Sequence, residues 1–559
     1  MKPITIRPDA IPAFIPQPTD EEPESAGSAL ARSGVMMAAG TVASRGTGFI
    51  RTVVIASAIG GGGVANAYAV ANTVPNALYD LLLGGILSAV IVPLLVQAAH
   101  DDDDDGEVYA QRLLTMVTVA LTVIAIFAVV LAPLIIKAYA GGAKEQQRAL
   151  AVTFARYFLP QLLFYGVGAT IGAILNVRGR FAAPMWAPVL NNVVVIASGI
   201  AFDVVTHTAP RPGHLTHQQT LILAVGTTAG VVLQTIALLP SLRAVGFRLK
   251  ARWDWRGAGL RRAGPFAGWV LGYVVTNQLG YLVIVQFAEA VGNGKGVYAL
   301  YSYAYILFSL PYAIVAVTVI TALFPQMSRS ATEGDEPAVA RALSQGLSIA
   351  GVVLVPATLI LVVLGPQIAV AVFQHGQVSP GNAQQTGDIL AAFGIGLVPF
   401  SMFQMQLRAW LAVRDSRTPM MVNLWVTAIN LVVDGILYIV LSTKHIGVGL
   451  AVGYAVSYMI GALIFMVKLR RRIPVPEKTY VIRTHVRLLL AAVIAAIPVE
   501  IVTHVLSGDF QAKPLGAVVT IVLGSGFGLV AFVLVARRIR ISEIDQLRGM
   551  LPGRLGRAG

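Results

Sequence analysis

Long runs of apolar residues alternate with short polar loops along most of the chain. A run of about 20 apolar residues is long enough to cross a bilayer as an α-helix. Because backbone polar groups cannot stay unpaired in lipid, the pattern predicts an all-α integral membrane protein. Fourteen transmembrane helices are expected, at residues 34–59, 64–98, 110–137, 147–176, 184–204, 218–242, 263–290, 297–327, 342–364, 386–412, 420–441, 447–467, 486–506 and 515–536.

The composition agrees with this pattern. Of the 559 residues, 56% are hydrophobic and only 12% are charged, and the mean hydropathy is +0.73. A soluble protein carries about 25% charged residues. The chain has no cysteine, which excludes a disulfide framework and a thiol nucleophile. No pattern typical of a catalytic site occurs either, so we expect a protein that is not an enzyme.

The positive charge is sorted between alternate loops. With the N-terminus placed inside, 31 of the 41 Lys and Arg residues lie in cytoplasmic segments and 7 in outer ones. This bias predicts that both termini are cytoplasmic. Residues 1–33 and 538–559 are then cytoplasmic tails, the first of them proline-rich and expected to be disordered. The net charge of +14 is explained by anionic lipid headgroups and predicts no nucleic-acid partner.

An internal repeat divides the predicted helices. Pro75 and Pro311 are 236 residues apart, and so are Arg178 and Arg414 in similar Val-Arg contexts. The spacing predicts two six-helix lobes of the same orientation, 34–243 and 263–468, followed by a helix pair at 486–537. Transporters built from such repeats hold their substrate between the lobes and expose it alternately to each side.

The first predicted helix carries two arginines, Arg45 and Arg51, on a polar face. Each arginine costs about 2.5–3.5 kcal/mol near the bilayer centre, so we expect this face to line a cavity and bind an anionic substrate. An ion pair between Arg45 and Asp80, at similar depth in the second helix, is the structural alternative. The second helix adds candidate cavity residues around a proline, namely Asn72, Asn76, Tyr79 and Asp80.

A second polar stripe lies on the eleventh predicted helix. Asn423, Thr427, Asn430 and Asp434 fall on one helix face and offer oxygen atoms, the ligands that hard cations prefer. Polar packing between helices is the alternative explanation of this stripe.

Four motifs occur in order along the chain: Ser44-Arg45-x-x-Gly48-Phe49-x-Arg51, Asn72-Thr73-x-Pro75-Asn76-x-x-Tyr79, Phe308-x-Leu310-Pro311 and Arg414-Asp415-Ser416-Arg417-Thr418-Pro419. Together they resemble the MurJ (MviN) family of the multidrug/oligosaccharidyl-lipid/polysaccharide exporter superfamily, particularly its actinobacterial members.

The resemblance implies a flippase of the bacterial plasma membrane. Its substrate is lipid II, undecaprenyl-diphosphate-linked MurNAc-pentapeptide-GlcNAc, which moves from the inner to the outer leaflet by alternating access. The diphosphate is expected in a cationic cavity and the lipid tail in a groove beside the last two helices. Other cell-wall synthesis proteins are candidate partners.

The resemblance implies no cofactor, but a coupling monovalent cation stays an open alternative. Some family members hold sodium between helices 7, 10 and 11, where Asp415 and the stripe of the eleventh helix are the candidate ligands. A flippase for another polyprenyl-linked glycan, a drug exporter of the MATE kind and a non-transporting envelope scaffold also stay open.

Four positions depart from the family pattern. Many members have an arginine at the position of Tyr79 and an acid at that of Asn66, and often an arginine and a glutamate near Ile306 and Ser309. The sequence therefore predicts a cavity in which the second lobe supplies no cation.

Overall fold

The computed structural model describes residues 23–80, 95, 106–206, 208–254, 264–290, 296–472 and 480–541. These residues form helices and connecting loops, and no strand occurs among them. Eleven of the described helices are long and apolar enough to cross a membrane, or twelve if the bent pair α15–α16 is one span. The predicted span 64–98 is described to Asp80 and at Leu95, so its remainder lies outside the described residues.

The helices fall into three groups along the chain. The N-terminal half comprises α1 (Pro23–Ile59), α2 (Gly63–Tyr79), α4 (Glu107–Val130), α5 (Ala132–Ala140), α6 (Glu145–Phe158), α7 (Gln161–Val177), α8 (Ala182–Val205), α9 (His217–Ile236) and α10 (Leu239–Ala244). The C-terminal half comprises α11 (Gly264–Ala290), α12 (Val297–Pro311), η4 (Tyr312–Ala316), α13 (Val317–Thr332), α14 (Glu336–Phe373), α15 (Pro380–Ile395), α16 (Leu397–Ala412), α17 (Arg417–Val440), η5 (Thr443–His445) and α18 (Ile446–Arg472). The last group is α19 (Tyr480–Val505) and α20 (Pro514–Arg538).

Helix α1 differs from its prediction at the start. It begins at Pro23, so it includes the last residues of the segment that the sequence predicts to be a disordered tail. The run Ala29–Ala38 contains alanine, leucine and methionine, which favour helix over irregular structure.

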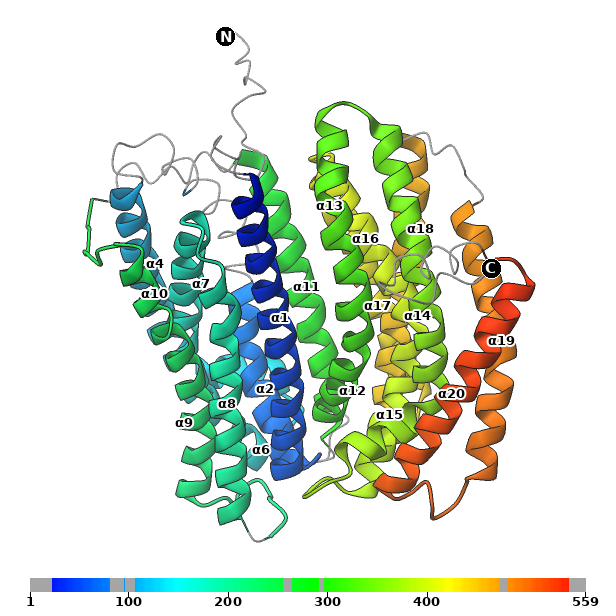
Figure 1. Ribbon diagram of the computed structural model, residues 1–559. Coiled ribbons are helices and arrows are strands. Elements are labelled where there is room, and N and C mark those ends of the chain that lie inside the picture. Colours follow the sequence, from blue (N-terminus) through cyan, green and yellow to red (C-terminus); the bar gives the residue numbers. More distant parts are fainter. Residues whose placement is uncertain are drawn as a thin grey trace.

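The two halves stand side by side, with α11 between them (Figure 1). Helix α11 packs against α5 of the N-terminal half and against α17 of its own half. The pair α19–α20 lies at the far edge of the C-terminal half and packs against α14. This arrangement leaves the interior between α1, α2, α11 and α12 as the place where the halves meet.

The end of the molecule at the bottom of Figure 1, here called the lower end, is closed by backbone contacts between the halves. The Tyr303 hydroxyl donates to the Gly60 carbonyl at 3.0 Å, and the Gln377 amide donates to the Ser57 carbonyl at 2.7 Å. Gly296 has φ +66°, and a Cβ there would lie 2.0 Å from the Gly61 carbonyl oxygen. Glycine therefore permits the close approach of α12 to the α1–α2 turn.

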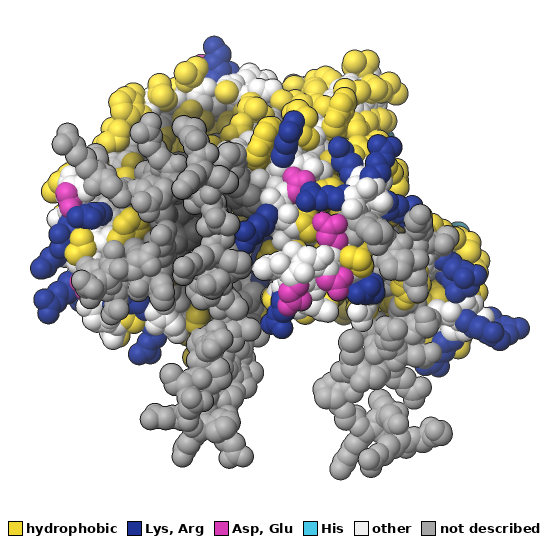
Figure 2. Space-filling model, turned by 90° about the horizontal axis from the view of Figure 1, so that it is seen from above, with side chains coloured by type: hydrophobic (Ala, Val, Ile, Leu, Met, Phe, Trp, Pro, Cys, Tyr) yellow, Lys and Arg dark blue, Asp and Glu magenta, His cyan; other side chains and the backbone are white. Residues whose placement is uncertain are grey.

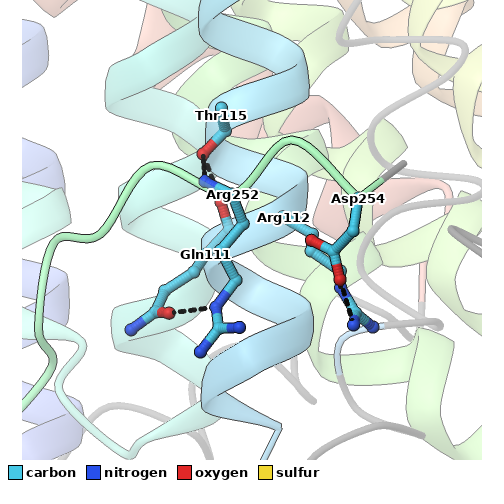
Figure 3. A network of polar contacts seen from close by, with 5 residues as sticks. All are labelled: Gln111, Arg112, Thr115, Arg252 and Asp254. Carbon is cyan, nitrogen blue, oxygen red and sulfur yellow. Dashed lines mark hydrogen bonds and ion pairs between the residues drawn. The ribbon is translucent and has the colours of Figure 1, made fainter. Parts of the chain in front are cut away.

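The opposite, upper end carries many Lys and Arg side chains, which Figure 2 shows around its rim. There the segment after α10 crosses the start of α4 (Figure 3). The Arg252 amide donates to Thr115 Oγ1 at 3.1 Å, and its side chain donates to Gln111 Oε1 at 2.8 Å. Arg112 Nε donates to Asp254 at 2.7 Å, and this hydrogen bond lowers the pKa of the Asp254 carboxyl.

Candidate functional site

The first cavity lies where the two halves meet and has a volume of about 250 Å³. Arg51 is the charged residue in its lining, and it faces amides, hydroxyls and tyrosine rings. The lining comes from α1, α2, α7, α8, α9, α11 and α12, and its polar members include Thr52, Tyr68, Asn72, Thr73, Asn76, Tyr165, Asn191, Thr227, Tyr281, Tyr298 and Ser302. One cation among neutral donors suits an anionic group that needs both charge and hydrogen bonds.

The second cavity adjoins the first and has a volume of about 440 Å³. The two cavities share Thr73, Asn76 and Tyr281 in their linings. The second is rich in aromatic rings and amides, and Asp80 is its charged lining residue. Its other lining residues include Asn277, Gln278, Tyr301, Tyr305, Phe400, Gln404, Thr427, Asn430, Tyr454, Ser457 and Tyr458. The cavity therefore suits a largely neutral ligand with polar and apolar faces.

Helix α2 supplies candidate residues to both cavities. Asn72 lines the first cavity, Asn76 lines both and Asp80 lines the second, as expected for positions spaced by four along one helix face. Tyr79 lines neither of these two cavities, and its role as a site residue stays a prediction. Its ring packs 4.9 Å from that of Tyr165, because α2 lies against α7 at this height.

The Arg45 side chain is exposed and lines neither cavity. Among the described residues it forms no ion pair with Asp80, which instead accepts a hydrogen bond from Gln278 Nε2 at 3.3 Å. The structural alternative for Arg45 is therefore not formed. Arg45 lies within electrostatic range of Tyr312, in the π-helical turn after α12.

A second arginine, Arg408 of α16, also lies within electrostatic range of Tyr312. Tyr312 thus lies within electrostatic range of one arginine from each half, and the expectation drawn from Ile306 and Ser309 did not consider Arg408. That expectation considered only the eighth predicted helix. The signal was present in the sequence, since Arg408 is an arginine inside the apolar run 386–412.

The five candidate cation ligands do not come together. Asp415 Oδ1 accepts from the Thr418 amide at 2.9 Å near the start of α17, and its Oδ2 pairs with Arg472 at 2.8 Å. Within the described residues, no group of three or more His, Asp and Glu side chains is placed to hold a metal ion. Asp415 lies apart from the stripe in this structure, because its carboxylate bonds to the first turn of α17 and pairs with Arg472.

The deeper part of the stripe keeps its polar character. Asp434 is fully buried, its Oδ2 accepts from Asn430 Nδ2 at 3.0 Å, and its Oδ1 has no hydrogen-bond partner among the residues that the structure describes. Asn430 and Thr427 also line the second cavity. Asn423 instead donates to the Tyr273 carbonyl at 3.3 Å, which is the interhelical packing named as the alternative.

Fold and site together define a class: a helical membrane protein with a partly cationic cavity between two groups of helices, as in transporters. Within this class the chain belongs to the MurJ family, because the family model described as "Lipid II flippase MurJ" matches residues 55–516.

Individual relatives agree with this assignment. The chain is 25% identical over 418 residues to "Probable lipid II flippase MurJ" of Vibrio cholerae, covering 73% of this chain and 77% of that protein. It is 26% identical over 439 residues to "Lipid II flippase MurJ" of Burkholderia cenocepacia, covering 77% and 82%.

Solved structures show the same fold. A structure titled "Lipid II flippase MurJ, inward closed conformation" matches with a TM-score of 0.73 and 19% identity, over 90% of this chain and 99% of that one. An inward-facing transporter of the multidrug resistance MATE family matches with a TM-score of 0.54 and 15% identity, over 76% and 98%.

Proposed function

We propose that the protein moves lipid II from the inner to the outer leaflet of the bacterial plasma membrane. The observation that carries the proposal is Arg51 in the lining of the first cavity, with Arg45 and Arg408 of the two halves within electrostatic range of Tyr312. Arginine stays charged in a membrane and binds phosphate oxygens through paired N–H groups, so it suits a diphosphate. Membership of the MurJ family supports this substrate.

In this proposal, each of the two cavities binds a different part of the substrate head group. The diphosphate interacts with Arg51 and neighbouring donors of the first cavity. The sugar and peptide portions occupy the second cavity, where rings such as Tyr454 and Tyr458 contact apolar sugar faces and amides such as Gln404 bond to hydroxyl and amide groups. The shared residues Thr73 and Asn76 connect the two sites.

The finer architecture belongs to the same proposal. Twelve described spans, with the bent pair α15–α16 counted as one, together with α1 and the span that starts with α2, give fourteen transmembrane helices. They form two six-helix lobes that rock about the cavities, and α19–α20 frame a groove for the lipid tail. The basic upper end, where α1 begins, faces the cytoplasm.

A monovalent cation is proposed to couple to transport at Asp434. The unpartnered Oδ1 of this buried carboxylate, with Asn430 and Thr427 nearby, fits a hard monovalent cation. These residues would hold the cation, which would compensate the buried negative charge. Asp415 and Asn423 do not contribute, because they bond elsewhere.

The decisive experiment compares Arg51→Gln with Arg156→Gln, an arginine of α6 that is exposed and lines neither cavity. Purified protein in vesicles is titrated with lipid II and with undecaprenyl diphosphate. We expect Arg51→Gln to weaken binding of both lipids at least about tenfold, the loss of one charged hydrogen bond, while Arg156→Gln binds both like the unchanged protein.

Equal binding by both variants would reject the arginine site. If the unchanged protein binds no lipid II, the alternatives apply. Binding of another polyprenyl-diphosphate glycan indicates a flippase for that glycan, and export of cationic drugs indicates a MATE-like exporter. If lipid II still reaches the outer leaflet after the protein is depleted, the protein is a non-transporting scaffold.

A further inference from the structure

Glu289, in the last turn of α11, is a fully buried carboxylate that the sequence analysis did not single out. Its Oε1 accepts a hydrogen bond from Asn66 Nδ2 of α2, and its Oε2 accepts one from Gln147 Nε2 of α6 at 2.9 Å. Asn66 and Gln147 are themselves buried. One carboxylate of the C-terminal half therefore bonds to two helices of the N-terminal half.

The orientation of the Asn66 amide is fixed by a further bond. Asn66 Oδ1 accepts from the Ala299 amide at 2.9 Å, in the first turn of α12. The Asn66 NH₂ group must therefore point at Glu289, which has to act as an acceptor. An ionised carboxylate meets this demand with both oxygens. If Glu289 is protonated, its O–H group faces the N–H donors of Asn66 or Gln147, and one hydrogen bond is lost. That bond can form again only if the Gln147 amide rotates and presents its oxygen.

No cation compensates Glu289 within the described residues. The ion pairs there join Arg112 to Asp254, Arg341 to Asp335 and Arg472 to Asp415. Titratable side chains on the helices around Glu289 include Tyr68 of α2, Lys137 and Tyr139 of α5, Glu145 and Arg148 of α6, Tyr298 and Tyr303 of α12 and Asp434 and Tyr438 of α17, and none of these bonds to it. Residues 291–295, including Lys295, lie outside the described part. A buried ionised group held only by neutral amides takes up a proton readily once its donors separate.

Glu289 lies at the closed lower end. The α12 start that Asn66 contacts is also where Gly296 meets the Gly61 carbonyl and where Tyr303 bonds to Gly60. Opening this end requires α2 and α6 to move away from α11 and α12, which breaks both bonds to Glu289. The free energy of opening therefore depends on whether the carboxyl group is ionised.

We propose that Glu289 is a proton-binding site that controls the opening of the lower end. Ionised, it holds α2 and α6 against α11 and keeps that end closed. A proton from water at that end adds to one carboxylate oxygen, gives the neutral acid and favours the open form. The inference rests on the transport function proposed above, whose outward opening this site regulates, but its test needs no substrate.

The absence of cysteine allows a direct test by spin labelling. Labels are attached to Thr208→Cys and Gly381→Cys, exposed positions of the two halves at the lower end, in the full chain reconstituted in lipid nanodiscs. The distance distribution is measured between pH 8 and pH 5. We expect a short distance at pH 8 and a growing longer-distance population as the pH falls.

Three substitutions distinguish proton binding from a structural role. Glu289→Gln should show the longer distance at both pH values, with no pH response. Gln147→Leu removes one donor to the ionised form, so its opening midpoint should rise by about one pH unit, a tenfold change in proton affinity. Asp388→Asn, an acid of α15 at the same end, is the matched control and should keep the response of the unchanged protein.

A distance distribution independent of pH in the unchanged protein would overturn the proposal, as would a Glu289→Gln variant that still responds to pH. If Glu289→Gln does not fold, an unshifted midpoint in Gln147→Leu decides against it. Failure here leaves lipid II binding intact, and failure of lipid II binding leaves the pH response intact, so the two proposals fail separately.

Discussion

Two aspartates, Asp415 just before α17 and Asp434 within it, differ in what their oxygens contact. Asp415 has its carboxylate saturated by the Thr418 amide and hydroxyl and by Arg472. Asp434 has one oxygen bonded to Asn430 and the other buried without a partner. A buried acceptor without a partner is costly, so Asp434 gains far more from a bound cation than Asp415 does.

This difference predicts the result of sodium titrations of thermal stability. Sodium at tenfold its dissociation constant should stabilise the unchanged protein by about 1.4 kcal/mol, seen as a higher melting temperature. Asp434→Asn should lose this increment, whereas Asp415→Asn, with a lower baseline, should retain it. Potassium at equal ionic strength separates specific binding from charge screening. An increment that survives in Asp434→Asn contradicts the cation site.

At the same scale, the sequence predicted residue chemistry better than side-chain direction. The cost of an arginine in a membrane helix pointed to Arg45 and Arg51, of which Arg51 lines the first cavity and Arg45 lines neither. The i, i+4 spacing put Asn72 and Asn76 on one face of α2, and both line the first cavity. Tyr79 shares their helix face, but its ring is held by Tyr165, and this contact depends on how α2 packs against α7. Partners that are distant in sequence, such as Asn66 and Glu289, are not visible in a periodic pattern.

Among the elements, hydrophobic run length predicted the helices well and their breaks poorly. Helices such as α8 and α17 match the predicted spans within about four residues. The 50° bend between α15 and α16 and the π-helical turn after Pro311 were not predicted. Both breaks fall inside apolar runs, because proline and glycine act on backbone geometry without changing hydropathy.

The contact between the α12 start and the α1–α2 turn gives a prediction for glycine substitutions. Gly296 and Gly334 both have positive φ, +66° and +78°, so alanine costs about 1 kcal/mol in backbone strain at either position. Only at Gly296 does the added Cβ also meet a backbone atom, the Gly61 carbonyl oxygen at 2.0 Å, whereas nothing lies within 4 Å at Gly334. Gly296→Ala should therefore lower the melting temperature clearly more than Gly334→Ala. Equal decreases in melting temperature for the two variants would mean that the lower end accommodates the added Cβ without a loss of stability.

For the whole molecule, the sequence predicted the all-helical membrane class and the family. The 236-residue spacing implied two related halves, and the structure has its polar cavities where α1, α2, α11 and α12 meet. The sequence does not indicate which end of the molecule is closed. That property follows from contacts between residues about 240–320 apart, such as Gly60 with Tyr303 and Ser57 with Gln377. A flippase needs a second state in which these contacts are broken, and composition cannot indicate which state is the more stable.

The orientation of the molecule in the membrane gives a final prediction. Most Lys and Arg residues belong to the upper end, and positive loops stay on the cytoplasmic side. Because the chain has no cysteine, a single Thr208→Cys at the lower end and a single Glu333→Cys at the upper end each provide one reactive site. A membrane-impermeant maleimide added to intact cells should label only Thr208→Cys, while Glu333→Cys should react after permeabilisation. The reverse pattern would place the closed lower end in the cytoplasm, and the direction of transport proposed here would have to be reversed with it.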